Sequence, residues 1–370
     1  MSTKIEIRSA PHVKGAATVE TIMKNVVWSL LPVCAFYIYQ YGISALAILL
    51  VVTASCLFAD RLFARLGGQS GDIGDWSATI TGILLALSIP PGFPLWMGFV
   101  LGFVAIALGK ALFGGIGRNV FNPALVGRAF GQAAFPTAIA TYTPSFMPGR
   151  FTEFIPSTLA LPFMTPADTA AWVAAAKLDA WAGATPLAKW KFETVIAPAM
   201  DLLTSTGGNL AVGPAPWLIV ACGLYLAARR FLDWRIPLAT VGGACLTGYV
   251  LFLISPGRYP DPTFVLLSGG LVFGAVYMAT DMATSPVTPR GVWVYGGLIG
   301  FLTVIIRYFS GLPEGVMYAI LIANAATPLI ERVTQPRPFG TASLGKIKGR
   351  AIYPLKPLDS AGKGREEDKK

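Results

Sequence analysis

The chain has 370 residues, of which 54% are hydrophobic and 13% are charged, and its formal net charge is +10. Soluble proteins carry about 25% charged residues, so this composition excludes a protein whose whole surface faces water. The basic residues lie in loops and tails without interleaved aromatic residues, a pattern that indicates cytoplasmic anchoring of a membrane protein and no nucleic-acid binding.

Redox centres that depend on His are excluded, and those that depend on Cys are disfavoured. The cysteines, Cys34, Cys56, Cys222 and Cys245, lie in apolar runs and form no CxxC pair, which disfavours disulfides and iron–sulfur clusters. The only histidine is His12, in the polar N-terminal tail. No His-ligated metal or bis-histidine haem is therefore predicted, and a cofactor that moves electrons through this chain has to be organic.

A polar N-terminal tail, residues 1–24, has no features of a cleavable signal peptide. Because a membrane span needs about 20 apolar residues, the runs that follow predict about ten helices in an all-α polytopic fold. The predicted spans are residues 25–41, 43–59, 76–90, 94–113, 119–140, 214–229, 236–256, 262–281, 291–309 and 313–331.

The long segment 141–213 separates a first transmembrane region, 25–140, from a second, 214–331, and a basic tail, 332–370, follows. With the N-terminus inside, most Lys and Arg residues fall in inner segments. The positive-inside rule therefore predicts that both termini are cytoplasmic and that 141–213 lies on the opposite side.

About five spans in each region would make the second region enter the membrane from the opposite side, as an inverted repeat. Helix breaks at matching places support this prediction. In the third span, Thr81–Leu84 leads to Pro90–Pro94; in the eighth, Ser268–Leu271 leads to Ser285–Pro289. The alternative is that these prolines form ordinary turns after two helices.

Polar residues cluster in the glycine-rich stretch Gly114–Ala124. Asn119 and Asn122 are three residues apart, so they would share one face of a first helical turn, where their amides could bind a heterocycle. The alternative is capping, because Asn followed by Pro123 is a common helix start.

Charged groups at membrane depth are costly and often functional. Thr280-Asp281 ends the eighth predicted span, where Asp281 could bind a cation, relay a proton or anchor a helix end. Arg128 lies in the fifth predicted span. It could pair with an acid, contact a phosphate or flavin, or extend toward the inner surface.

In the outer segment, Thr185 follows a run of mostly small residues, Asp179-Ala-Trp-Ala-Gly183-Ala184, and precedes Pro186. Small neighbours and the following proline predict a sterically open Thr185, as a modifying enzyme needs. The pattern is also that of an ordinary turn.

Several of these motifs, in this order, resemble the RnfD/NqrB family of flavinylated membrane subunits. Its members belong to Rnf complexes and, more distantly, to the sodium-pumping NADH–quinone reductase. The resemblance covers roughly residues 20–335. Its motifs are Thr79–Leu87 with the Pro-Pro break, Gly114–Ala124, Asp179–Leu187, Tyr277–Gly291, Pro313–Met317 and Asn324–Pro328.

The resemblance implies FMN joined to Thr185 by a phosphoester, within a sequence that includes Asp179, Gly183 and Ala184, and attached from FAD by a separate flavin transferase. Ala182 stands where the family has Ser or Thr. A second family motif is not recognisable in Ser205–Gly213. Riboflavin held without a covalent bond near Asn119 and Asn122 is also implied.

The resemblance further implies a urea-transporter-like fold in the bacterial inner membrane, with a periplasmic flavin loop. The implied function is electron transfer within an ion-translocating ferredoxin–NAD oxidoreductase that moves Na⁺ or H⁺. Partners would be a second covalent-FMN subunit, other membrane subunits, and soluble subunits that handle NADH and ferredoxin. The chain would not be catalytic alone. Rival interpretations are a small-solute channel or transporter, or a structural scaffold.

Overall fold

The computed structural model describes residues 18–67, 75–115, 117–162, 164, 172, 185–204, 215–311 and 314–336. These residues are largely helical, and no strand occurs among them. The chain divides into a unit of Met1–Thr334, which holds every helix described below, and a C-terminal unit, Gln335–Lys370.

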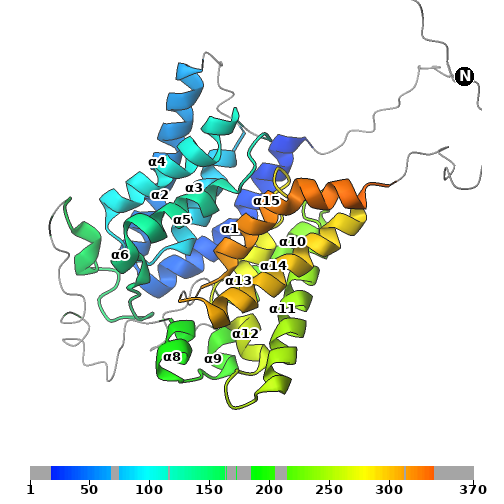
Figure 1. Ribbon diagram of the computed structural model, residues 1–370. Helices are drawn as coiled ribbons and strands as arrows, with labels where there is room; N and C mark the ends of the chain where they lie inside the picture. The colour runs from blue at the N-terminus through cyan, green and yellow to red at the C-terminus, as the bar shows by residue number, and fades with distance from the viewer. Residues whose placement is uncertain are drawn as a thin grey trace, which may run out of the picture. The chain divides into compact units, whose positions relative to one another are not determined.

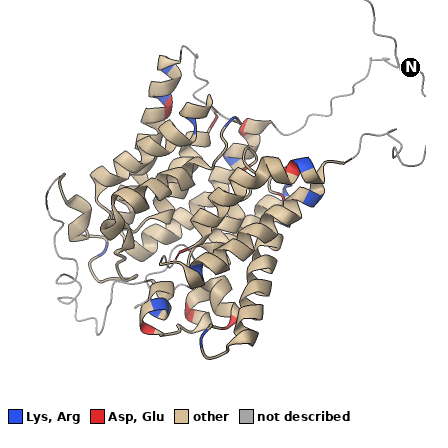
Figure 2. Ribbon diagram, viewed as in Figure 1, with Lys and Arg blue, Asp and Glu red and all other residues tan. Residues whose placement is uncertain are grey.

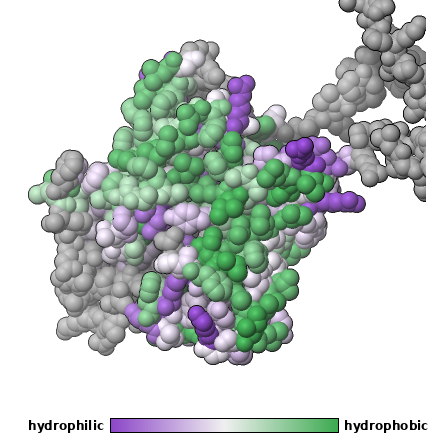
Figure 3. Space-filling model, in the orientation of Figure 1, coloured by the Kyte–Doolittle hydropathy of each residue, from purple (hydrophilic) through white to green (hydrophobic). Residues whose placement is uncertain are grey.

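Six helices are long and apolar enough to cross a membrane, so the chain is a multi-pass membrane protein. Figure 2 shows that they carry few charged residues along their lengths, and Figure 3 shows apolar side chains over much of the visible helical surface. They are α1 (Val19–Tyr41), α2 (Ile43–Leu66), α4 (Leu95–Gly109, extended by a 3₁₀ turn to Phe113), α11 (Arg235–Ile254), α14 (Pro289–Phe309) and α15 (Val316–Thr334).

Shorter helical segments occupy the remaining predicted ranges. They are α3 (Ser77–Ser88), α5 (Pro123–Ala134), α10 (Pro216–Ala228) and the broken helix that begins with α12 (Pro262–Leu267). The prediction of one continuous span over 119–140 is wrong. Phe135 leaves the helical conformation between α5 and α6 (Pro136–Ala140), because a residue before proline is disfavoured in a helix.

The interruption predicted at Pro90–Pro94 is confirmed, but the eighth predicted span breaks at Ser268–Gly270 and not at Ser285–Pro289, which lies between the end of that span and α14. α3 ends at Ser88, just before the Pro-Pro sequence. After α12 the helix breaks at Ser268–Gly270, and Gly269 has a φ of +64°, which favours glycine. The chain then continues as α13 (Leu271–Phe273) and one π-helical turn, Gly274–Met278.

Glycines bring two helix pairs into close contact. A Cβ added at Gly102 of α4 would lie 2.9 Å from the Val52 carbonyl oxygen of α2. A Cβ added at Gly243 of α11 would lie 2.7 Å from the Gly297 carbonyl oxygen of α14. Each of the two helical regions is thus built around one tightly packed pair, since only glycine permits such an approach.

The two regions meet where α1 packs against α10 and α5 packs against α15 (Figure 1). Two buried hydrogen bonds join them. The Asn122 amide donates to the Met278 carbonyl over 3.1 Å, and the Tyr277 hydroxyl donates to the Ser29 carbonyl over 3.2 Å. This boundary holds the residues that the sequence singled out.

Short helices form the outer segment as far as it is described. They are a 3₁₀ turn at Pro156–Leu159, α8 (Pro186–Glu193) and α9 (Ala199–Thr204). In Figure 1, α8 and α9 lie beside α12, at the end of the bundle away from the start of α1 and the end of α15. A small apolar cluster of Leu187, Leu202 and Phe264 joins them to α12.

Candidate functional site

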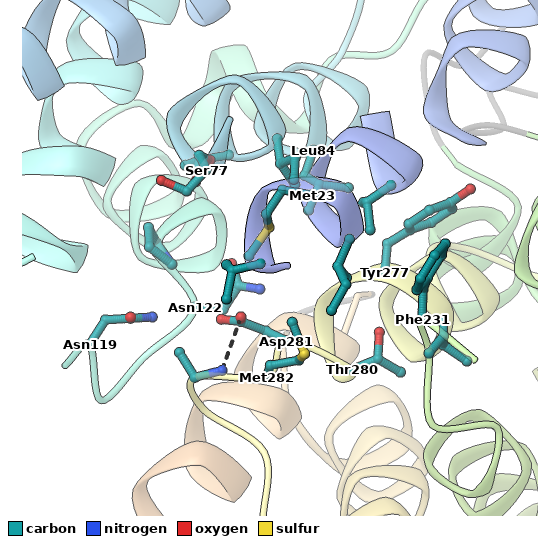
Figure 4. A pocket seen from close by; sticks show the side chains of 18 of the residues that line it. Met23, Ser77, Leu84, Asn119, Asn122, Phe231, Tyr277, Thr280, Asp281 and Met282 are labelled. Atoms are coloured by element: carbon teal, nitrogen blue, oxygen red, sulfur yellow. Dashed lines mark hydrogen bonds between the residues drawn. The ribbon is translucent and has the colours of Figure 1, made fainter. Parts of the chain in front are cut away.

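The larger cavity at the boundary has a volume of about 470 Å³ and contains both predicted asparagines and the predicted ion-pathway residues. This volume lies within the range of about 300–1,000 Å³ that is usual for small-molecule sites. Apolar side chains of α1, α3, α10 and the π turn form most of its wall. Its polar lining residues are Ser77, Thr81, Lys110, Asn119, Asn122, Tyr277, Thr280 and Asp281 (Figure 4). We call this the inner cavity.

The two asparagines reach the inner cavity from different local structures. Asn122 caps α5, because its side-chain oxygen accepts a hydrogen bond from the Ala124 N–H over 3.0 Å. The capping interpretation of Asn122 is therefore confirmed. Asn119 precedes the helix, so the prediction that both lie on one helical face is wrong. Its amide donates to the Phe121 carbonyl over 3.2 Å, a bond that a ligand carbonyl could replace.

Asp281 lies just after the π turn and points into the inner cavity (Figure 4). It is half-buried, and its carboxylate accepts the Ala283 N–H over 3.3 Å and the Thr284 hydroxyl over 3.4 Å. Thr280 lies beside it, but its hydroxyl donates to the Val276 carbonyl over 2.6 Å. The carboxylate retains acceptor capacity for a cation or a ligand N–H.

The π turn determines which groups face this cavity. The Ala279 N–H bonds the Gly274 carbonyl over 2.7 Å, five residues earlier. This wide turn leaves the Met278 carbonyl free to accept the Asn122 amide. π turns inside helices occur frequently at functional sites. Nothing in the sequence pattern distinguishes this turn from an α-helix.

A charged cluster at the edge of the inner cavity was missed by sequence reasoning. The Lys110 ammonium lies 2.7 Å from Asp60 and 3.4 Å from Asp75, and it donates to the Ser77 hydroxyl over 2.8 Å. These residues come from α2, the start of α3 and the end of α4. Because they are far apart in the chain, no local spacing signals the cluster.

The second cavity, which we call the outer cavity, brings Thr185 and Arg128 together. Its volume is about 50 Å³. It lies about one helical turn from the inner cavity along α3 and α5, since Leu84 and Asn122 line the inner cavity and Leu87 and Leu125 line the outer one. Further lining residues include Tyr37, Tyr142, Gly269, Gly270, Phe273 and Glu314.

Arg128 pairs with an acid, one of the predicted alternatives. Its guanidinium contacts the Glu314 carboxylate, which lies just before α15, so the pair joins the two helical regions. The Arg128 side chain is buried. Burial raises the pKa of the nearby Tyr142 hydroxyl to about 12, so this group stays protonated at neutral pH. Glu314 could not be assigned from its spacing because 186 residues separate it from Arg128.

Thr185 is not sterically open, so that prediction is wrong. Its residue exposure is 7%, and its hydroxyl oxygen accepts the Ala188 N–H over 3.2 Å as the N-cap of α8. Pro186 at the first helical position favours this helix start. The predicted site residues Asp179, Gly183 and Ala184 lie outside the described residues. Ala182 and Ser205–Gly213 also lie outside them.

Arg307 is a further buried cation, in addition to Lys110 and Arg128. It lies in the last turn of α14 with 1% exposure. Its guanidinium donates to the carbonyls of Val265, over 2.6 Å, and Ser268, over 3.0 Å. It therefore satisfies the free carbonyls at the end of α12, which the helix break leaves without backbone partners.

Comparison with known proteins places this arrangement in a family. The profile of the NQR2, RnfD, RnfE family matches residues 6–340. This chain belongs to that family. One relative is the RnfD subunit of the Na⁺-translocating ferredoxin:NAD⁺ oxidoreductase complex of Acetobacterium woodii. It is 36% identical over 345 residues, which cover 92% of this chain and 97% of the relative.

Two further members of the family show similar coverage. The RnfD subunit of the proton-translocating ferredoxin:NAD⁺ oxidoreductase complex of Clostridium ljungdahlii is 34% identical, over 90% of this chain and 96% of the relative. The RnfD subunit of the ion-translocating oxidoreductase complex of Halorhodospira halophila is 33% identical, over 92% and 97%. Membership of the family thus extends across both helical regions.

The two cavities differ in how well they fit the flavins that the resemblance implies. The inner cavity has the volume, apolar walls and amide groups suited to a flat heterocycle such as riboflavin. The outer cavity has suitable linkage chemistry, with a hydroxyl at Thr185 and a guanidinium at Arg128. Its volume, however, is far below that of ligand sites, so an FMN group does not fit the arrangement described.

Proposed function

We propose that this chain is a membrane subunit of an ion-translocating ferredoxin–NAD oxidoreductase complex. The observation that carries the proposal is the family match over residues 6–340, together with three relatives that are named as subunits of such complexes or of ion-translocating oxidoreductases. The chain would pass electrons between cofactors of neighbouring subunits and would not be catalytic alone.

The proposed topology has about ten spans in two inverted repeats, in a urea-transporter-like arrangement. Matching neighbours in the two helical regions support it. α2 packs against α3 and α4, as α11 packs against the broken helix and α14; α4 contacts α5, as α14 contacts α15. The glycine-mediated pairs, α2 with α4 and α11 with α14, occupy equivalent places in this scheme.

The proposed orientation has both termini in the cytoplasm of a bacterium and α8 on the periplasmic side of the inner membrane. The distribution of Lys and Arg along the chain supports it. So does the position of α8, at the end of the bundle away from the start of α1 and the end of α15 (Figure 1). The inner cavity, at the start of α1, would then open toward the cytoplasm.

The proposed covalent cofactor is FMN on Thr185, attached by a flavin transferase that recognises Asp179, Gly183 and Ala184. Arg128 lies in the same cavity and would balance the negative charge of the phosphoester. A flavin accepts electrons singly or in pairs, and nearby hydrogen bonds and charges tune its potential. A second subunit with its own covalent FMN would exchange electrons with this site.

Riboflavin is the proposed ligand of the inner cavity, with Asn119 and Asn122 as hydrogen-bonding residues. Asp281 and Thr280 would belong to the path of the Na⁺ or H⁺ that the complex moves. Among the described residues that line this cavity, Asp281 is the only one with a carboxylate. An acid at the edge of a membrane span is typical of ion paths. Soluble subunits would handle NADH and ferredoxin.

A channel or secondary transporter for a small solute is the second candidate, because broken helices at a repeat boundary are common in transporters. The test is in-gel flavin fluorescence of the denatured chain, produced with its flavin transferase. We expect a fluorescent wild-type band and a dark Thr185→Ala band. A dark wild-type band, with the transferase active on another substrate, would favour the transporter.

A further inference from the structure

The break in the eighth predicted span leaves backbone carbonyls without helical partners. α12 ends at Leu267, and the chain leaves the helical conformation over Ser268–Gly270 before α13 begins. The last carbonyls of a helix have no donor within that helix. In membrane proteins built from repeats, carbonyls at such breaks commonly coordinate the transported Na⁺. The break is therefore a place where a cation could bind inside the helical bundle.

Arg307 reaches this place from the neighbouring helix α14. Its guanidinium donates to the Val265 carbonyl over 2.6 Å and to the Ser268 carbonyl over 3.0 Å. A Cβ added at Gly269 would lie 3.2 Å from the Arg307 Nη2 atom, so glycine at the break leaves the room that the guanidinium needs. The guanidinium thus occupies the position from which a cation would contact these carbonyls.

The charge of Arg307 has no carboxylate beside it. Among the described residues no ion pair includes Arg307, whereas Arg128, which is also buried, contacts Glu314. A buried charge is costly unless polar groups compensate it. The compensation for Arg307 comes from carbonyl dipoles, and the break therefore retains a full positive charge.

Two buried polar atoms at the break have no partner in the described part of the chain. They are the Arg307 Nε atom and the Ser268 Oγ atom. Ser268 is fully buried, at 0% exposure. Hard cations in proteins bind carbonyl and other oxygen ligands. Without the guanidinium, the break would offer a cation two carbonyl oxygens and this hydroxyl.

The inner cavity has the opposite electrostatic character. Asp281 lines it, and the cluster at its edge sets two carboxylates, Asp60 and Asp75, against the single ammonium of Lys110. Low-dielectric walls strengthen such fields. Cations should therefore gather at the inner cavity and be repelled at the break, where Arg307 lies.

We propose that the Arg307 guanidinium is a tethered cation that occupies the carbonyl site of the break and closes it to Na⁺. A fixed arginine charge is a known means of excluding cations from a membrane path. An ion that reaches Asp281 then has to leave by another route, a consequence that rests on the proposed role of Asp281. The closure itself requires only that the chain spans a membrane.

The test is passive Na⁺ uptake into liposomes that contain the full chain, followed with a radioactive Na⁺ tracer and without any electron donor. The key variant is Arg307→Gln, which removes the charge and keeps an N–H donor. We expect its initial rate of uptake to rise about tenfold or more over the wild type. Arg307→Lys keeps the charge, so its rate should stay within about twofold of the wild type.

Two controls separate an opened cation site from damaged packing. Arg290→Gln removes an exposed charge from the first turn of the same helix and should leave Na⁺ uptake unchanged. Chloride flux, measured in the same liposomes, should also stay unchanged in Arg307→Gln, because carbonyl oxygens coordinate cations and not anions.

Each other outcome contradicts the inference in its own way. Slow Na⁺ uptake in Arg307→Gln would mean that packing alone closes the break. Equally fast uptake in Arg307→Lys and Arg307→Gln would assign the closure to hydrogen-bond geometry and not to charge. A parallel rise in chloride flux, or fast uptake in Arg290→Gln, would show general damage. Failure of the proposed function appears separately, as a chain that carries no flavin while its Na⁺ uptake follows the expected pattern.

Discussion

The inner and outer cavities lie along the same boundary between the two helical regions, yet one is open and the other is nearly filled. The inner cavity, about 470 Å³, is bounded by a π turn and a glycine-rich approach to α5, which leave space between apolar walls. The outer cavity, about 50 Å³, is occupied by the Arg128–Glu314 pair and closed by α8. The same interface therefore supplies a ready small-molecule site at one end and a protected covalent site at the other.

The largest expected effect comes from filling the inner cavity alone. Ile80 lines it and is half-buried, so Ile80→Trp should place an indole where a flat ligand would lie. We expect extractable riboflavin to fall about tenfold or more, because overpacking leaves no room for the ligand, while covalent fluorescence stays unchanged. Thr79→Trp, at a neighbouring position that does not line the cavity, is the control. If both variants retained the same amount of riboflavin, the inner cavity would not be the riboflavin site.

The ion pair of the outer cavity should be the next most sensitive feature. Arg128→Ala leaves the Glu314 carboxylate without its partner, and breaking a buried pair costs about 3–5 kcal/mol. Because Glu314 is partly exposed, at 23%, we expect about 2–3 kcal/mol of lost stability in detergent unfolding. The double variant Arg128→Met with Glu314→Gln should recover part of this loss. If the stability loss of the double variant equalled the sum of the losses of the two single variants, the ion pair would contribute no coupling energy.

The two asparagines of the inner cavity should differ in their effect on stability. Asn122→Ala removes a helix cap and the hydrogen bond to the Met278 carbonyl, for a combined cost of about 2 kcal/mol. Asn119→Ala removes the bond to the Phe121 carbonyl and no helix cap, and it should cost about 0.5 kcal/mol. Thermal unfolding of both variants beside the wild type measures the difference. Equal destabilisation would contradict the different roles assigned to them.

The smallest expected effect is local to α8. Thr185→Ala removes the cap that accepts the Ala188 N–H, at a cost of about 1 kcal/mol. This change should appear as faster amide hydrogen exchange in Pro186–Glu193, with little change in the membrane helices. Thr185→Ser keeps the hydroxyl and should keep both the slow exchange and the covalent flavin. Unchanged exchange in Thr185→Ala would mean that docking alone orders α8.

Features encoded by neighbouring residues were predictable. Asn122-Pro123 caps a helix, and α3 stops before the Pro-Pro sequence, because capping and proline geometry depend on a few consecutive residues. Pairings between distant residues were not predictable from one sequence. Arg128 with Glu314 and Lys110 with Asp60 became visible only after the helices had packed.

The sequence by itself determined the membrane class, the family and the end of α3 before the Pro-Pro sequence, because hydrophobicity, motif order and proline placement are written along the chain. Only the tertiary structure decided that Thr185 is enclosed. Its small neighbours and the following proline suggested an open hydroxyl, but the next helix packs through Leu187 against Phe264 and Gly269, which lie far along the chain. Burial is a property of packed surfaces, and no local pattern encodes it.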